Sequence, residues 1–183
     1  MDSEHIYDVV SYILGACIGL FGICGNIAAF IGFQKQSKKT STSFLFQALT
    51  ITDTGVLITF ALWTSWPVLQ YDVPIILYLG LIALNQMAIL ASNGVNVLLT
   101  VTRFIDVCFP PHASRYCSIA RVRCYLIATI FVLVAFIIPY MLHFFRIEII
   151  SSFTLTFIYR PLMYFALPVL IITTITLILV FKL

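Results

Sequence analysis

Residues 92–110, SNGVNVLLTVTRFIDVCFP, carry the pattern from which the fold can be inferred. The stretch begins as an apolar helix and ends in a basic loop that is broken by proline. Arg103 stands where the apolar run gives out. A charged side chain at the end of a membrane-length apolar helix costs free energy, so Arg103 is a candidate functional residue. We expect the other segments of the chain to be helices packed around this one.

The composition is that of a membrane protein. Of the 183 residues, 62% are hydrophobic and only 9% are charged, and the mean hydropathy is +1.09. A soluble globular domain has about 45–50% apolar and about 25% charged residues. The net charge of +3 is modest, and no basic face or arginine-rich run indicates nucleic-acid binding. We therefore expect the lipid bilayer, and no nucleic acid, as a partner.

Five segments are long and apolar enough to span a bilayer, which takes about 20 residues. They lie at about 9–33, 44–69, 74–108, 122–145 and 161–181. Alternating β patterning over ten-residue units is absent from the sequence, so we predict an all-α helical bundle and no barrel. Residues 1–183 then form a single transmembrane domain. The acidic start, MDSEHIYD, predicts that no signal peptide is cleaved.

The loop charges predict the orientation of the bundle. Three lysines follow the first segment between residues 35 and 39, and three arginines lie between residues 115 and 123. The N-terminus and the opposite loops carry most of the acidic residues. Because positively charged loops stay in the cytoplasm, we expect the N-terminus outside. Arg103 and the C-terminus are then cytoplasmic.

A few polar residues lie deep inside the apolar segments. Asp53 is the one acid deep in an apolar span, Asn26 lies in the first segment, and Ser92 lies in the third. A carboxylate in a bilayer must be paired, solvated, metal-bound or protonated. The three residues are therefore a candidate site for water or a sodium ion. The alternative is that they only hydrogen-bond neighbouring helices together.

A polar stripe on the third segment has two interpretations. Asn85 and Ser92 are seven residues apart and so share a helix face. That face would line either a ligand cavity or a polar seam between helices. Trp63 and Trp66 lie near the outer end of the second segment, as interfacial anchors do. They are also candidates, with Asn85, for an outer ligand pocket.

The sequence contains no catalytic arrangement. The three histidines have no acid partner at a useful spacing, and no glycine-rich phosphate loop occurs. We therefore predict that the chain is not an enzyme and has no cofactor beyond the candidate sodium ion. A small transporter or channel subunit with Asp53 in its pathway is the alternative to a receptor. No inverted repeat of the transporter kind is present in the sequence.

The chain resembles a rhodopsin-like (class A) G-protein-coupled receptor, on motifs at mutually consistent spacings. Pro139 and Pro168 resemble the prolines of the family's fourth and fifth helices. Residues 107–121, VCFPPHASRYCSIAR, are similar to the corresponding loop of invertebrate FMRFamide-type neuropeptide receptors. The other motifs are Gly25-Asn26, Leu49 with Asp53, Ser92 eleven residues before Arg103, Thr102-Arg103-Phe104, and Pro110 seven residues after Arg103.

The resemblance implies a receptor of the plasma membrane that binds an extracellular ligand and transduces the signal to a heterotrimeric G protein. Arg103, Phe104 and Pro110 would couple to the G protein. Asn26, Asp53 and Ser92 would form the sodium and water site. Asn85 replaces the acid that amine receptors use, so the resemblance favours a peptide ligand.

The chain also departs from the family pattern. Thr102 stands where the family has an acid, with Asp106 as the candidate replacement partner for Arg103. The family's outer disulfide has no counterpart, since Tyr78 stands near its first position and residues 143–160 lack cysteine. Five helices of seven are recognised. We therefore expect a truncated receptor that does not signal on its own, or one that joins a receptor oligomer.

Overall fold

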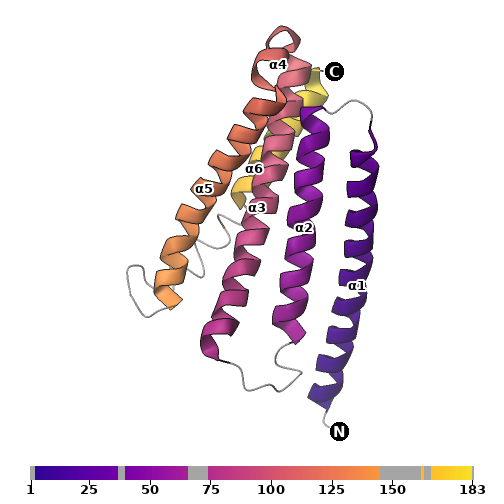
Figure 1. The fold of residues 1–183 in the computed structure, drawn as a ribbon, viewed down its shortest axis with the longest axis vertical. Coiled ribbons are helices and arrows are strands. Elements are labelled where there is room, and N and C mark those ends of the chain that lie inside the picture. Colours follow the sequence, from indigo (N-terminus) through magenta and orange to yellow (C-terminus); the bar gives the residue numbers. More distant parts are fainter. Residues whose placement is uncertain (1–2, 37–39, 66–73, 145–161, 163–165, 183) are drawn as a thin grey trace.

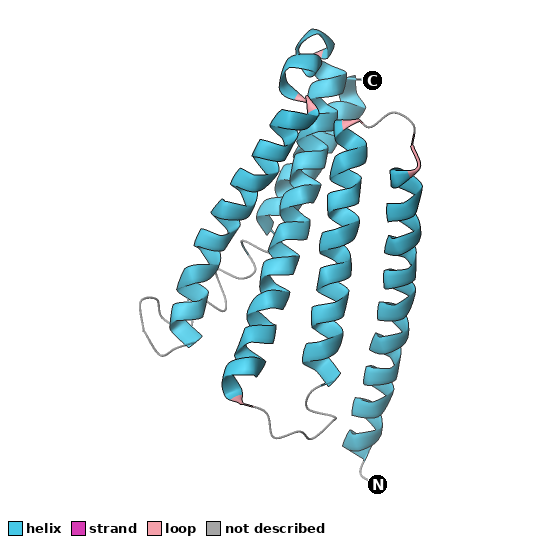
Figure 2. Ribbon diagram, in the orientation of Figure 1, coloured by secondary structure: helices cyan, strands magenta, loops and turns pink. Residues whose placement is uncertain are grey.

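The computed structural model describes residues 3–36, 40–65, 74–144, 162 and 166–182. Within these ranges the regular elements are helices and no strand occurs (Figure 2). The prediction of an all-α fold is confirmed. The helices are α1 Ser3–Gln34, α2 Ser41–Ser65, α3 Ile75–Cys108, α4 Pro110–Tyr116, α5 Ile119–Phe144 and α6 Leu167–Lys182.

Three helices of the described chain are long and apolar enough to cross a membrane. These stretches are Ile13–Gln34, Ser41–Leu62 and Leu77–Cys108, and Leu167–Phe181 is a shorter apolar helix. Five spans were expected, with ends that differ from the observed helices by a few residues. Parts of three expected spans, at 66–69, 145, 161 and 163–165, lie outside the described residues.

The start of α2 shows why a sequence pattern misplaces a helix end. Thr40 is its N-cap, and the backbone N–H of Ser43 donates to Thr40 Oγ1 at 3.1 Å. An oxygen in this position satisfies one of the N–H groups that a helix start leaves without a partner. The helix therefore begins at Ser41, before the apolar run that sets the expected start at residue 44.

The expectation of a loop after Cys108 is wrong for residues 110–116, which form the short helix α4. Proline does end α3, but it also suits the first position of a new helix, where its missing N–H is not needed. Phe109 makes the corner, and its N–H donates to the Ile105 carbonyl at 2.9 Å. At the other end of α4, the N–H of Cys117 donates to the Ala113 carbonyl at 2.8 Å.

The helices are arranged around α3, as the sequence predicted, except that α1 packs on α2 (Figure 1). Helix α3 contacts α2, α4, α5 and α6. The long helices run roughly alongside one another, and α4 lies at the end of α3 (Figure 1). The N-terminal end of α1 and the short helix α4 are at opposite ends of the bundle (Figure 1).

The core lies where α2, α3 and α5 meet. Leu45 and Val122 are fully buried, and Val95 is 1% exposed. Around them pack six partly buried apolar residues: Phe44, Ala48, Leu49, Leu98, Leu99 and Leu126. By contrast, large apolar side chains such as Phe21, 80% exposed, cover the outside. An apolar exterior of this kind is expected where lipid, and not water, surrounds the helices.

Helix α1 packs against α2 at two positions along its length. The rings of Phe33 and Phe46 stack with centroids 4.9 Å apart. About three turns further toward the N-terminus of α1, Gly22 lies against Leu57. A Cβ at Gly22 would come within 2.7 Å of Leu57 Cδ1. The absent side chain at Gly22 therefore allows the close approach, as small residues commonly do between membrane helices.

Candidate functional site

A polar seam joins α2 to α3. The hydroxyl of Ser92 donates a hydrogen bond to Asp53 Oδ1. Two turns away on α3, Asn85 Oδ1 accepts a hydrogen bond of 3.0 Å from the Thr59 hydroxyl. Asn85 and Ser92 are both buried, at 5% and 9% exposure. Two hydrogen bonds from one face of α3 to α2 make the arrangement that the polar-seam interpretation describes.

Asn26 lines a pocket of about 240 Å³ between α1 and α2, together with Ile27, Phe30, Thr50, Ile51 and Thr54. Both threonine hydroxyls in this pocket donate to their own helix: Thr50 to the Gln47 carbonyl at 2.8 Å, and Thr54 to the Thr50 carbonyl at 2.7 Å. Of the three residues proposed for the sodium and water site, Asp53 and Ser92 are joined by a hydrogen bond, and the site itself stays a prediction.

Of the three residues proposed for an outer ligand pocket, only Asn85 has a described side chain. Trp66 and the side chain of Trp63 lie outside the described residues. Asn85 is bonded to Thr59 across the helix interface. The ligand pocket itself therefore stays a prediction.

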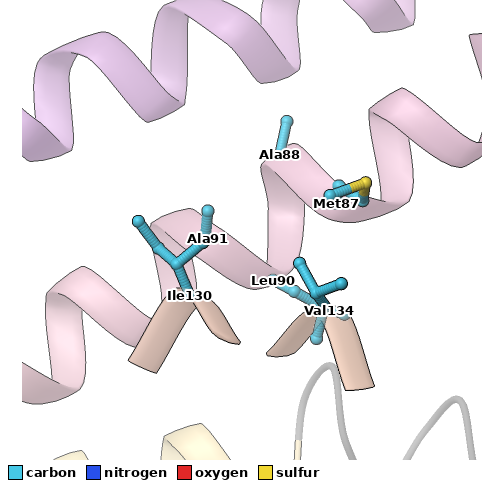
Figure 3. Close-up of a pocket in the computed structure, with 6 residues that line it drawn as sticks. All are labelled: Met87, Ala88, Leu90, Ala91, Ile130 and Val134. Atoms are coloured by element: carbon cyan, nitrogen blue, oxygen red, sulfur yellow. The ribbon is translucent and has the colours of Figure 1, made fainter. Parts of the chain in front are cut away.

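An apolar pocket of about 210 Å³ lies between α3 and α5 (Figure 3). Ile130 and Val134 of α5 face Leu90 and Ala91 of α3 (Figure 3). The remaining lining residues are Met87 and Ala88. None of the six side chains carries a charge or a hydrogen-bonding O or N atom. The pocket has no group that would bind the charged or amide parts of a peptide.

The last turns of α3 present the residues predicted to couple to a G protein. Arg103 is exposed. Phe104 packs edge-on against Phe109, with ring centroids 6.0 Å apart and an interplanar angle of 72°. Pro110 is the first residue of α4. The three residues are thus gathered where α3 turns into α4.

The side chains around Arg103 include contacts that the sequence did not reveal. Thr102 is 4% exposed, and its hydroxyl donates to the Leu99 carbonyl at 2.9 Å. Cys117, 8% exposed, donates through its thiol to the Thr102 carbonyl at 3.8 Å. Asp106, expected as a partner for Arg103, lies beside Cys117.

The Cys117 thiol is kept in its neutral form. Burial raises its pKa above the ordinary value of 9.0, and the negative charge of Asp106 and a hydrogen bond from the thiol to that carboxylate raise it further. A neutral thiol is a weak hydrogen-bond donor. No sequence motif marks Cys117, because its role depends on a contact across 15 residues. All five cysteines are free thiols.

Fold and composition define a multi-pass helical membrane protein. The chain belongs to the serpentine type 7TM GPCR chemoreceptor Srx family, whose sequence profile matches residues 16–183. This is a family of G-protein-coupled receptors and not of enzymes. The chain is also 25% identical over 154 residues to an FMRFamide receptor of Drosophila melanogaster. The aligned part is 76% of this chain and 27% of that receptor, so the chain spans about a quarter of its length.

Proposed function

We propose that the chain acts as part of a rhodopsin-like receptor of the plasma membrane that passes the signal of a peptide ligand to a heterotrimeric G protein. The observation that carries the proposal is the exposed Arg103 at the junction of α3 and α4, on a helix whose middle is bonded to α2 through Asp53 and Ser92. The similarity to an FMRFamide receptor supports a peptide of that class as the ligand.

Arg103, Phe104 and Pro110 form the proposed G-protein surface. A guanidinium carries five N–H donors and stays charged, so an exposed arginine can bind carbonyl and carboxylate oxygens of a partner. The Phe104–Phe109 contact fixes the corner next to it. A ligand would act by changing the relative affinity of two arrangements of the bundle for the G protein.

The Asp53–Ser92 pair is the proposed sodium and water site, with Asn26 as a third member. One carboxylate oxygen of Asp53 accepts from Ser92, and a carboxylate has further lone pairs for a cation. Ser92 would orient the carboxylate toward the ion. Asn26 lines the pocket between α1 and α2 beside Thr54, the residue that follows Asp53 in the chain.

We propose further that these 183 residues do not signal on their own and that signalling requires a seven-helix assembly. The family is described as having seven transmembrane segments, and the chain aligns with about a quarter of the FMRFamide receptor. The 183-residue chain in membranes with a G protein and FMRFamide peptide should therefore give no peptide-dependent nucleotide exchange. Peptide-dependent exchange by the chain alone would refute this part of the proposal.

A chimeric receptor tests the function itself. The part of the Drosophila FMRFamide receptor that aligns with this chain is replaced by this chain, and FMRFamide binding and nucleotide exchange are measured separately. We expect both to be retained. Arg103→Ala should lower stimulated exchange about tenfold or more at unchanged peptide binding, because a charge-assisted contact is lost. Lys35→Ala, which removes an exposed charge after α1, is the matched control.

Peptide binding and nucleotide exchange, measured separately in the chimera, test the peptide ligand and the coupling surface separately. Absence of peptide binding would contradict the peptide ligand. Binding with no exchange would contradict the coupling surface, as would an Arg103→Ala variant that couples as well as the Lys35→Ala control.

A further inference from the structure

Helix α4 is attached to α3 at both of its ends. At its start, Phe109 contacts Phe104. Just past its end, the Cys117 thiol reaches the Thr102 carbonyl. Thr102 and Phe104 are the two neighbours of Arg103 in the chain. The position of α4 and the surroundings of Arg103 are therefore set by the same pair of contacts.

Asp106 is the charged side chain beside this contact. It lies one helical turn after Thr102, on the same face of α3, and its negative charge lies near Cys117. Burial and this carboxylate together raise the pKa of the thiol, so Cys117 keeps its one proton for the Thr102 carbonyl. We call this group the α4 latch: the donor Cys117, the accepting carbonyl of Thr102, and Asp106.

We propose that Cys117 is a positioning residue, which holds α4 against the end of α3 through the α4 latch and so sets the surface beside Arg103 that meets the G protein. That this surface meets a G protein rests on the proposed function. The latch itself does not depend on that function, since it is a contact within the chain. Cys117 acts through α4 and does not touch the G protein, because it is buried.

The competing explanation is that Cys117 is only a small buried side chain. The two explanations predict opposite results when the stability of α4 is compared between two variants. Cys117→Ser keeps a hydrogen-bond donor, whereas Cys117→Ala keeps an apolar side chain and removes the donor. If the donor matters, serine preserves α4 and alanine loosens it. If only apolar burial matters, serine is the more disruptive substitution, because a buried polar group with no partner is costly.

Hydrogen exchange of α4 measures the latch directly, with the 183-residue chain in lipid nanodiscs. The amides of His112 and Ala113 both donate to the Phe109 carbonyl, at 2.9 and 3.1 Å. We expect Cys117→Ala to speed their exchange about twofold, the factor that a hydrogen bond at the weak end of the usual range provides. Cys117→Ser and the control Cys124→Ala, at an exposed cysteine, should leave the rate unchanged.

Cys117→Val supplies a second donor-free variant should Cys117→Ala fail to fold. Valine fills the buried position with apolar atoms and has no donor, so exchange at His112 and Ala113 should again be faster than in Cys117→Ser. Equal exchange in the serine variant and the donor-free variant, or faster exchange in Cys117→Ser, would overturn the latch.

The chimeric receptor tests the consequence for coupling. Cys117→Ala should lower FMRFamide-stimulated nucleotide exchange at unchanged peptide binding, and Cys117→Ser should restore it. Unchanged exchange in the Cys117→Ala chimera would overturn the positioning role. If the unsubstituted chimera fails to couple, the proposed function is refuted. The hydrogen exchange of α4 in nanodiscs still tests the latch, because that experiment needs no G protein.

Discussion

Removing the Ser92 hydroxyl should cost more stability than removing a comparable hydroxyl that stays within one helix. Ser92 donates to the Asp53 carboxylate on α2, and it is 9% exposed. Side-chain hydrogen bonds between membrane helices average about 0.6 kcal/mol and reach about 1.7 kcal/mol. Because the acceptor is a carboxylate, and bonds to charged groups are stronger, we place Ser92→Ala near the upper figure, at about 1.5 kcal/mol.

Thr100→Val is the matched control for this substitution. The Thr100 hydroxyl donates to the Asn96 carbonyl of its own helix at 2.9 Å, so its removal breaks no contact between helices. We expect this control to change the free energy of unfolding by less than about 0.5 kcal/mol. The comparison separates the loss of a hydroxyl from the loss of the contact between α2 and α3.

The assay is unfolding by a denaturing detergent, followed by tryptophan fluorescence, since the chain contains two tryptophans. A double-mutant cycle of Ser92→Ala with Asp53→Ala should give a coupling energy of about 1 to 1.5 kcal/mol. Coupling below about 0.3 kcal/mol, within the scatter of independent sites, would refute the bond as a structural tie. A loss in Thr100→Val as large as that in Ser92→Ala would refute it as well.

One further substitution pair tests the packing between helices, and a labelling experiment tests the environment of the buried thiol. Gly22→Ala should leave the chain less stable than Gly25→Ala by about 1 kcal/mol, because its new Cβ would meet Leu57 Cδ1 and that side chain must shift. Gly25→Ala, with no atom within 4 Å of the added Cβ, should be neutral or stabilising by about 0.5–1 kcal/mol; thermal unfolding in nanodiscs measures both. Iodoacetamide should label Cys117 more slowly than the exposed Cys124 at every pH. The Cys117 rate should still be rising with pH above 9.0, the ordinary thiol pKa, because its own pKa is raised; equal rates by mass spectrometry would contradict its burial.

The raised pKa of Cys117 also gives the latch a pH dependence of definite sign. A raised folded-state pKa means that folding favours the protonated thiol. The stabilisation is therefore complete below the ordinary pKa and is lost as pH rises through the folded-state value. Hydrogen exchange of α4 should accordingly accelerate at alkaline pH more in the natural chain than in Cys117→Ala.

The fold could be predicted from the sequence because a bilayer leaves few choices. Long apolar runs must be helical to satisfy their own backbone groups, and α3 over Ile75–Cys108 nearly coincides with the expected 74–108. Helix α4 was missed because a double proline ends one helix and equally well begins another. That choice depends on whether the next turn finds something to pack against, and in this chain it packs against α3.

Residues on one helix face, such as Asn85 and Ser92, could be grouped from their spacing, whereas contacts between helices depend on how the helices are rotated. Asp53 of α2 and Ser92 of α3 were assigned to one site, and they are bonded. Asn26 was grouped with them by its depth and by the family resemblance, and it lines a pocket with Thr50 and Thr54. Cys117 gave no signal, because a buried thiol is recognised only from its neighbours in space.

The membrane sidedness of α4 tests the assignment of the Arg103 end of α3 as the G-protein surface most directly. His112 is exposed on α4, so His112→Cys offers a thiol for a membrane-impermeant maleimide, with the natural chain as background. In intact cells that express the chain, we predict no labelling beyond this background. Additional labelling should appear after the plasma membrane is permeabilised. Additional labelling of His112→Cys in intact cells would place Arg103 outside the cell and contradict the account.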